Sequence, residues 1–177
     1  EATRALVEPL HHVIVQLDAE IMVVEERLAH LCTQEPVIRL LQTAPGVAAI
    51  VAATFVSVID DAGRFHNAHQ VEAYLGLVPS EDSSGGRRRI GAITKEGNGY
   101  ARAVLVQAAW NVLRIAKADD PLRRWGEGIE ARRGNRIAVV ALARRLAGIL
   151  WSMWRRDTVY EPTRLGVATA RGLEGQA

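Results

Sequence analysis

A run of hydroxyl, glycine and arginine residues near the middle of the chain has the composition that phosphate chemistry needs. Ser83-Ser84-Gly85-Gly86 is followed at once by Arg87, Arg88 and Arg89, and Lys95 comes shortly after. A serine oxygen can attack phosphorus while guanidinium groups neutralise the charge that develops on the non-bridging oxygens. A base or a metal must still remove the serine proton. Such a run is also typical of a solvated turn, so these residues alone leave both interpretations open.

The Pro45-Gly46 turn between two apolar stretches is a second candidate for phosphate binding. Free backbone N–H groups and the dipole at the start of the second helix favour an anion there without any side chain. The pattern resembles a helix-hairpin-helix element and predicts a nucleic-acid contact at Gly46. Ala48 stands where such elements usually carry a second glycine, and a plain turn in a helical bundle is the alternative.

The other residues with chemical potential favour structural roles. His66 and His69 lack further ligands at zinc-like spacing and the other histidines lie on an N-terminal helix, so we expect no metal site in this chain. Asp60-Asp61 are typical of a turn that ends a helix. Three of the four tryptophans fall in apolar helical patterns, whereas Trp125, beside Arg123-Arg124, could stack on a base.

Charge is distributed unevenly along the 177 residues, which together carry a net charge of +2. Residues 1–82 hold 4 Lys+Arg and 12 Asp+Glu, a net of −8, whereas residues 83–177 hold 18 and 8, a net of +10. This asymmetry favours a polyanion as the partner of the second half. Arginines that solvate helix faces, supplied in number by a GC-rich genome, are the alternative.

Composition also restricts the class of protein. The single cysteine, Cys32, excludes a disulfide-stapled scaffold and fits the cytosol, with Cys32 as a small core residue. Residues 40–59 carry no charge, but the Pro45-Gly46 break predicts a buried helix there and no membrane span. The chain starts with Glu1 and has no basic-then-apolar leader, so we expect a fragment of a cytoplasmic protein.

Apolar periodicity predicts an all-α fold that positions these residues. Helices are expected over residues 35–41, 47–59, 67–74, 99–117, 120–132 and 136–156, and the last of them is expected to be the central core helix. Residues 80–99 are rich in glycine and serine around two short extended runs. They predict an exposed loop or loose hairpin that carries the serine and arginine run.

Residues 3–31 predict a long N-terminal helix of roughly 40 Å with a coiled-coil seam. Apolar residues recur there at spacings of three and four: Leu6, Leu10, Val13, Leu17, Ile21, Val24, Leu28 and Leu31. Pro9 is expected in a first turn or at a later helix start. We expect residues 1–34 to form a coiled-coil arm, 35–156 a helical domain and 157–177 a surface tail. Packing of the stripe on the rest of the chain is the alternative.

Several motifs occur in an order that resembles a known family. They are APG-V-A-A-x-V-A-A, F-x-x-A-x-Q-V-x-A-Y-L-G-L-V-P, SSGG-R-x-R-x-G-x-I-T-K-x-G-N, Y-A-R and a late A-V-V-A-L-A-R-R-L-A-x-I-L-W helix. Together they cover about residues 38–156. This order resembles the C-terminal transposase domain of the insertion-sequence 110 family, which is related to Piv-type DNA invertases.

The resemblance implies a catalytic role for Ser84, the serine directly before glycine, which would attack DNA and form a covalent phosphoserine link. Ser83 is the backup, because the doublet leaves the register open by one residue. Basic residues in the same motifs are expected to bind nucleic acid: Arg87, Arg88, Arg89, Lys95 and Arg102.

The resemblance also implies parts that this chain does not include. Members of the family carry an N-terminal RuvC-like domain with four metal-binding acidic residues, followed by a coiled-coil linker. We expect this chain to start in that linker. We therefore expect magnesium to come from that missing domain and the isolated chain to be inactive. The expected partners are DNA, a structured guide RNA (the bridge RNA of the element) and a second copy bound through the arm, in the nucleoid of a bacterium or archaeon.

The alternative function is a non-catalytic helix-hairpin-helix DNA-binding module with a dimerising arm, which leaves the SSGG run unexplained. A helix-hairpin-helix base-excision enzyme would need a catalytic Asp or Lys at a set distance after the hairpin. Asp60 and Asp61 come too early for this role, and Lys95 lies in a glycine-rich loop.

Overall fold

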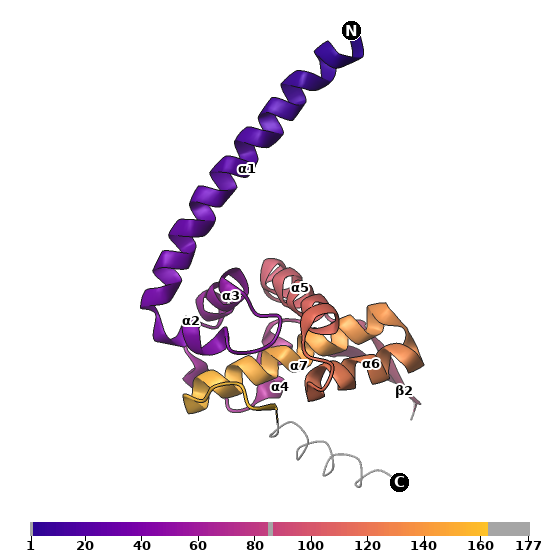
Figure 1. Cartoon of the computed structure of the whole chain (residues 1–177). Coiled ribbons are helices and arrows are strands. Elements are labelled where there is room, and N and C mark those ends of the chain that lie inside the picture. Colours follow the sequence, from indigo (N-terminus) through magenta and orange to yellow (C-terminus); the bar gives the residue numbers. More distant parts are fainter. Residues whose placement is uncertain (1, 85–86, 163–177) are drawn as a thin grey trace.

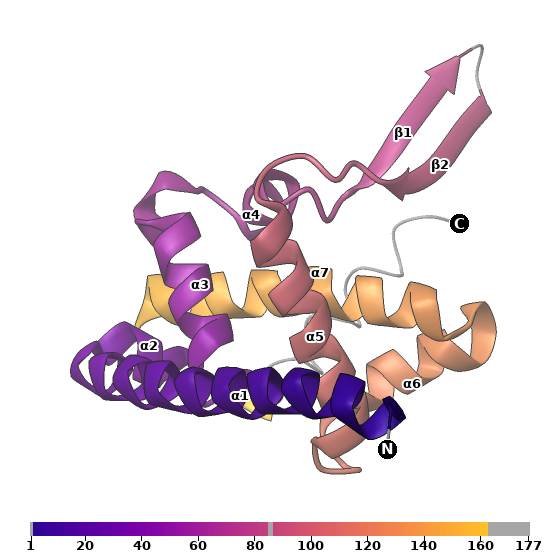
Figure 2. The same cartoon turned by 90° about the horizontal axis from the view of Figure 1, so that it is seen from above.

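A computed structural model shows a helical body, one long helix that projects from it and a two-stranded hairpin (Figures 1 and 2). The structure describes residues 2–84 and 87–162, with side chains for residues 6–80 and 91–162. The elements follow the order α1 (Ala2–Gln34), α2 (Pro36–Leu41), α3 (Ala49–Ile59), η1 (Ala62–Arg64), α4 (Ala68–Tyr74), β1 (Pro79–Ser84), β2 (Arg87–Ile93), α5 (Gly99–Ile115), α6 (Pro121–Arg133) and α7 (Asn135–Arg156).

The mostly helical fold is confirmed for the described residues, and each expected helix is present with ends shifted by a few residues. Local caps explain why the helices begin where they do. Helices α4, α5 and α6 are capped by Asn67, Asn98 and Asp120 respectively. In each case the side-chain oxygen of the cap accepts a hydrogen bond from a backbone N–H in the first turn of the helix. The two extended runs of residues 80–99 pair as antiparallel strands, so of the expected exposed loop or loose hairpin the structure shows the hairpin.

Helix α7 forms the centre of the body, as its composition predicts, and packs against α2, α4, α5 and α6. Its buried residues are Ala138, Val139, Leu142, Ala143, Leu146, Ala147, Gly148, Leu150 and Met153. By length and composition, α7 could cross a membrane, yet half of its apolar window is buried inside the fold. Burial among four helices explains the apolar composition, and α7 is a core helix here.

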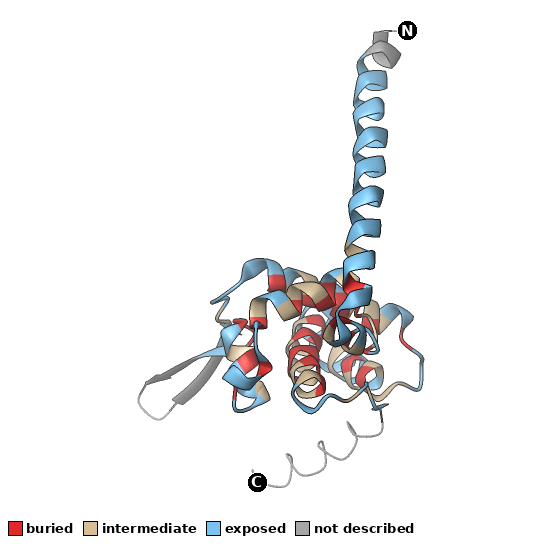
Figure 3. Cartoon of the chain, turned by 90° about the vertical axis from the view of Figure 1, so that its left-hand side faces the viewer, coloured by how far each residue is buried: buried red, intermediate tan, exposed pale blue. Residues whose placement is uncertain are grey.

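Helix α1 leaves the body and points away from it, and its exposed surface is visible along its length (Figure 3). Of its described side chains, those of residues 6–27 are exposed, Leu28 is half-buried and Cys32 is buried. Burial raises the pKa of the Cys32 thiol. Most of the apolar stripe therefore does not pack on the described body of this chain, whereas Leu28 packs against its core. Pro9 lies inside α1, so its expected place in a first turn is wrong; an interior proline leaves one i to i−4 hydrogen bond unmade.

The segment after α7 was expected to lie on the surface, but Tyr160 contacts the body. The Tyr160 backbone N–H donates to Thr43 Oγ1 at 3.0 Å, and its hydroxyl donates to the carboxylate of Asp120 at 3.1 Å. Burial and the Asp120 charge raise the pKa of Tyr160. The ring is apolar while its hydroxyl finds an acceptor, so this residue packs on the body. Residues 163–177 of the expected tail lie outside the described residues.

Candidate nucleic-acid interface

The hairpin that carries the serine and arginine run is fixed to the body by two glycines at its base. Gly76 has φ of +65° and Gly97 has φ of +71°. A Cβ atom added at Gly76 would lie 2.1 Å from the Glu96 carbonyl oxygen, and one at Gly97 would lie 2.1 Å from the Tyr74 carbonyl oxygen. The two chain segments thus touch backbone to backbone, which only glycine permits here.

Arg102 reinforces the same junction from the first turns of α5. Its Nη1 donates to the carbonyl oxygens of Leu75, at 3.2 Å, and of Glu96. The Lys95 backbone N–H also donates to the Gly76 carbonyl oxygen at 3.1 Å. Arg102 was expected to bind nucleic acid, and the structure gives it a positioning contact that joins the end of α4 to the start of α5. That expectation remains a prediction.

The strand register places the serine doublet opposite arginines. Ser84 pairs with Arg87 and Ser83 pairs with Arg88 at the end of the hairpin that lies farthest from the body (Figure 2). Gly85 and Gly86, and the side chains of residues 81–90, lie outside the described residues. Directly opposed residues in an antiparallel pair are close neighbours. The fold therefore brings hydroxyl-bearing and guanidinium-bearing positions together at one tip.

Lys95 does not belong to this tip. It has φ of +59° and an exposed side chain at the base of the hairpin. Roughly 25 Å of extended chain separates it from Arg87 at about 3.4 Å per residue. The basic residues expected to bind nucleic acid are therefore spread along β2 and the segment that follows it. They do not surround a single phosphate.

Gly46 lies at a different place, against the middle of α5. It has φ of +76°, and an added Cβ would lie 2.5 Å from the Ala108 carbonyl oxygen. Close packing on α5 is thus sufficient to require glycine at this position. Ala48, the N-cap of α3, is exposed and makes no side-chain cap. The predicted phosphate contact at Gly46 remains a prediction, but Gly46 is not part of the hairpin tip.

The remaining candidates have structural contacts. Asp60 ends α3 with φ of +65°, and Asp61 Oδ1 accepts the Gly63 backbone N–H at 2.7 Å, so the turn interpretation is confirmed. Within residues 6–80 and 91–162, no group of three or more His, Cys, Asp or Glu side chains could hold a metal ion.

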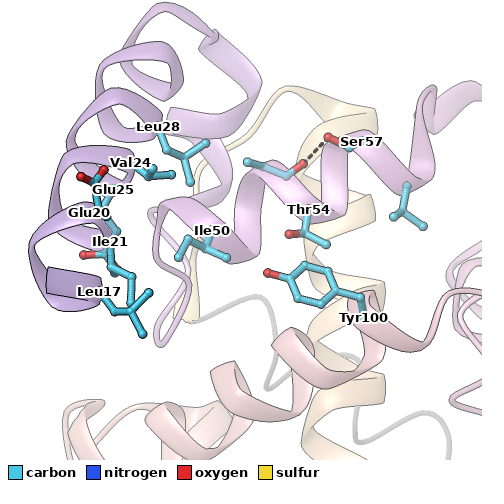
Figure 4. Close-up of a pocket in the computed structure, with 12 residues that line it drawn as sticks. Leu17, Glu20, Ile21, Val24, Glu25, Leu28, Ile50, Thr54, Ser57 and Tyr100 are labelled. Carbon is cyan, nitrogen blue, oxygen red and sulfur yellow. Dashed lines mark hydrogen bonds between the residues drawn. The ribbon is translucent and has the colours of Figure 1, made fainter. Parts of the chain in front are cut away.

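An apolar groove of about 680 Å³ lies between α1 and α3 (Figure 4). Four residues of the predicted seam line one wall of it: Leu17, Ile21, Val24 and Leu28. Ile50 and Thr54 of α3 and Tyr100 of α5 line the other side. The exposed seam of the arm therefore continues onto the body as one apolar surface.

Comparison with known proteins places these features in a family. Residues 38–122 match the transposase family described as IS116/IS110/IS902. The chain is similar to a probable family 20 transposase of Pseudomonas aeruginosa, with 35% identity over 87% of this chain and 48% of that protein. It is also similar to the transposase for insertion sequence element IS1111A of Coxiella burnetii, with 33% identity over 77% of this chain and 38% of that protein.

A third relative is the transposase for insertion sequence element IS1328 of Yersinia enterocolitica, which is 31% identical over 88% of this chain and 47% of that protein. The chain thus spans less than half the length of each of these relatives. The matched region includes the Pro-Gly turn, the hairpin and α5.

Proposed function

Because residues 38–122 are a transposase domain of the IS116/IS110/IS902 family, we propose that this chain supplies the serine nucleophile of a DNA transposase. Transposases cut and rejoin DNA. In this proposal the hydroxyl of Ser84 attacks a DNA phosphate, with Ser83 as the backup. The strand register carries the proposal, because it sets Ser84 opposite Arg87 and Ser83 opposite Arg88 at a projecting tip.

The proposed step exchanges one phosphate ester for another. The Ser84 oxygen forms a bond to phosphorus, a strand P–O bond breaks, and the departing oxygen leaves with its electron pair. The serine proton passes to a base of the assembled enzyme. Guanidinium groups along β2 stabilise the charge on the non-bridging oxygens, and Gly76, Gly97 and Arg102 hold the base of the hairpin on the body.

Other parts of the reaction lie outside this chain in the proposal. Four acidic residues of an N-terminal RuvC-like domain supply magnesium, and a structured guide RNA selects the DNA sites. The expected inactivity of the isolated chain follows from this division. Support comes from the length of the relatives, of which the matched region is less than half.

The proposal also assigns the arm to self-association. The described part of α1 exposes a seam that no other described part of the chain covers, with Leu17 57%, Ile21 53% and Val24 61% exposed. A heptad-like seam of this kind is stable when a second helix covers it. Two copies joined in this way would present two hairpins to the DNA.

The test replaces each serine separately in the full-length protein. We expect Ser84→Ala to bind its nucleic acids and fold normally, but to form no covalent adduct with labelled DNA and no recombinant product. Ser83→Ala is the matched control and is expected to retain measurable activity. Adducts are measured by denaturing electrophoresis, and folding by thermal unfolding.

Two outcomes would contradict this assignment in different ways. If only Ser83→Ala loses activity, the nucleophile is Ser83 and not Ser84. Normal recombination by both variants places the nucleophile elsewhere and favours the non-catalytic DNA-binding module.

A further inference from the structure

A small cavity between α4, α6 and α7 is lined by Arg145, a half-buried arginine that contacts a tryptophan ring. The cavity, of about 300 Å³, is lined by Glu72, Trp125, Ala141, Arg144 and Arg145. Arg145 Cζ lies 4.5 Å from the centre of the Trp125 ring, so the guanidinium lies over the indole in a cation–π contact. Such a contact restricts the position of the guanidinium and uses none of its N–H donors.

Arg145 has no acidic partner among the side chains that the structure describes. It is half-buried, and no hydrogen bond or ion pair joins it to another of those residues. Burial lowers the pKa of its guanidinium, and the nearby Tyr160 opposes this shift. The group stays charged at neutral pH because an arginine pKa is so high. A half-buried cation with five N–H donors and no carboxylate is costly unless an external acceptor satisfies it.

The neighbouring arginine differs in this respect. Arg144 Nε donates to Glu72 Oε2 at 2.5 Å, and Glu72 also lies 3.6 Å from His69 Nδ1. The only acidic residue of the cavity is therefore already paired with Arg144. Among the described residues that line the cavity, Arg145 is the cation without a carboxylate partner, and so the cavity favours an anion.

The surroundings indicate which anion fits. Helices α6 and α7 together carry nine arginines and two acidic residues, so the field around the cavity is strongly positive. A cavity of about 300 Å³ has room for one phosphate with part of its sugar. One face of the Trp125 ring is covered by Arg145, which leaves the guanidinium edge as the group that meets the ligand.

The geometry points to a second nucleic-acid contact, separate from the hairpin, in which Arg145 binds a backbone phosphate and Trp125 holds the guanidinium in position. This inference rests on the proposed function, because it assigns a further binding site to the same nucleic-acid partner. The phosphate could belong to a duplex or to an unpaired strand. Both present the same phosphodiester chemistry.

The test measures binding of this chain to labelled duplex DNA, single-stranded DNA and single-stranded RNA over a series of salt concentrations. We expect Arg145→Ala to reduce the magnitude of the slope of log affinity against log salt concentration by about 0.9 for duplex and about 0.7 for single strands. This is the change expected when one phosphate contact is lost. Arg145→Lys keeps the charge and is expected to retain the slope while losing affinity. Thermal unfolding verifies that each variant is folded.

Arg114→Ala is the matched control, since the Arg114 guanidinium also lies over a tryptophan, 5.3 Å from the Trp110 ring centre, without lining this cavity. We expect its slope to stay that of the parent. A change for single strands alone identifies an unpaired strand as the ligand, and a change for all three probes identifies any backbone phosphate.

An unchanged slope for folded Arg145→Ala with all three probes would overturn the inference, as would an equal change in Arg114→Ala. Loss of self-association without a change in slope would assign the cavity to a protein partner and also overturn it. These outcomes leave the serine assignment untouched, because that depends on adduct formation by Ser84→Ala.

Discussion

Helices α1 and α7 are the two longest helices and both carry a regular apolar pattern, yet they end in opposite environments. Helix α7 buries residues along its whole length between α2, α4, α5 and α6. Helix α1 contacts α2 and α3 at its C-terminal end and exposes its seam elsewhere. An apolar pattern therefore shows that a helix needs another surface to pack against. Whether that surface lies in the same chain is decided by the rest of the fold.

Small residues account for part of the difference. Gly126 of α6 lies so close to α7 that an added Cβ would be 2.5 Å from Leu142 Cδ1, and a Cβ added at Gly148 of α7 would be 3.1 Å from Ala68 Cβ of α4. Such contacts let helices approach closely and bury α7 on several sides. Helix α1 has no glycine, and its long side chains extend into solvent.

The largest expected effect is on the buried helix. Leu146→Ala removes a fully buried side chain and is expected to lower the free energy of unfolding by about 2–5 kcal/mol, measured by urea denaturation. The comparison variant Leu10→Ala, at a 65% exposed position of α1, is expected to change it by less than about 0.5 kcal/mol. Equal effects at the two positions would contradict the contrast between the helices.

Next in size is a pair of glycine substitutions on α6. Gly126→Ala is expected to destabilise the protein by about 1–3 kcal/mol, because the new methyl group collides with Leu142. Gly128→Ala meets no atom within 4 Å and is expected to stabilise it by about 0.5–1 kcal/mol through helix propensity. Both are measured by denaturant unfolding, and a stable Gly126→Ala would show that α6 and α7 are packed less closely.

The smallest effect on stability is expected from the exposed seam. Ile21→Asp should change the free energy of unfolding of the body by less than about 0.5 kcal/mol, since Ile21 is 53% exposed. It should nevertheless dissociate the self-associated form, because a charge in a coiled-coil seam is unfavourable. Sedimentation measures the mass, and Ala19→Asp, off the seam, is the control. An unchanged mass for Ile21→Asp would assign the seam to another partner or to none.

Local chemistry made much of the fold predictable. Asn67 and Asn98 cap the helices that follow them, and the Pro45-Gly46 break separates α2 from α3. These signals act within a few residues, so the sequence alone displays them. The sequence leaves a loop and a hairpin as alternatives for residues 80–99, because short extended runs do not show whether they pair; the structure pairs residues 79–84 with 87–93.

The sequence by itself determined the helices, their caps, the charged second half and the serine and arginine run. Only the tertiary structure decided that Arg102 holds the hairpin through Leu75, 27 residues away, that Glu72 pairs with Arg144, 72 residues away, and that Arg145 stacks on Trp125. The physical reason is the range of the interactions. Caps and turns join neighbours in the chain, whereas these contacts join residues that become neighbours only after helix packing, and no sequence period links them.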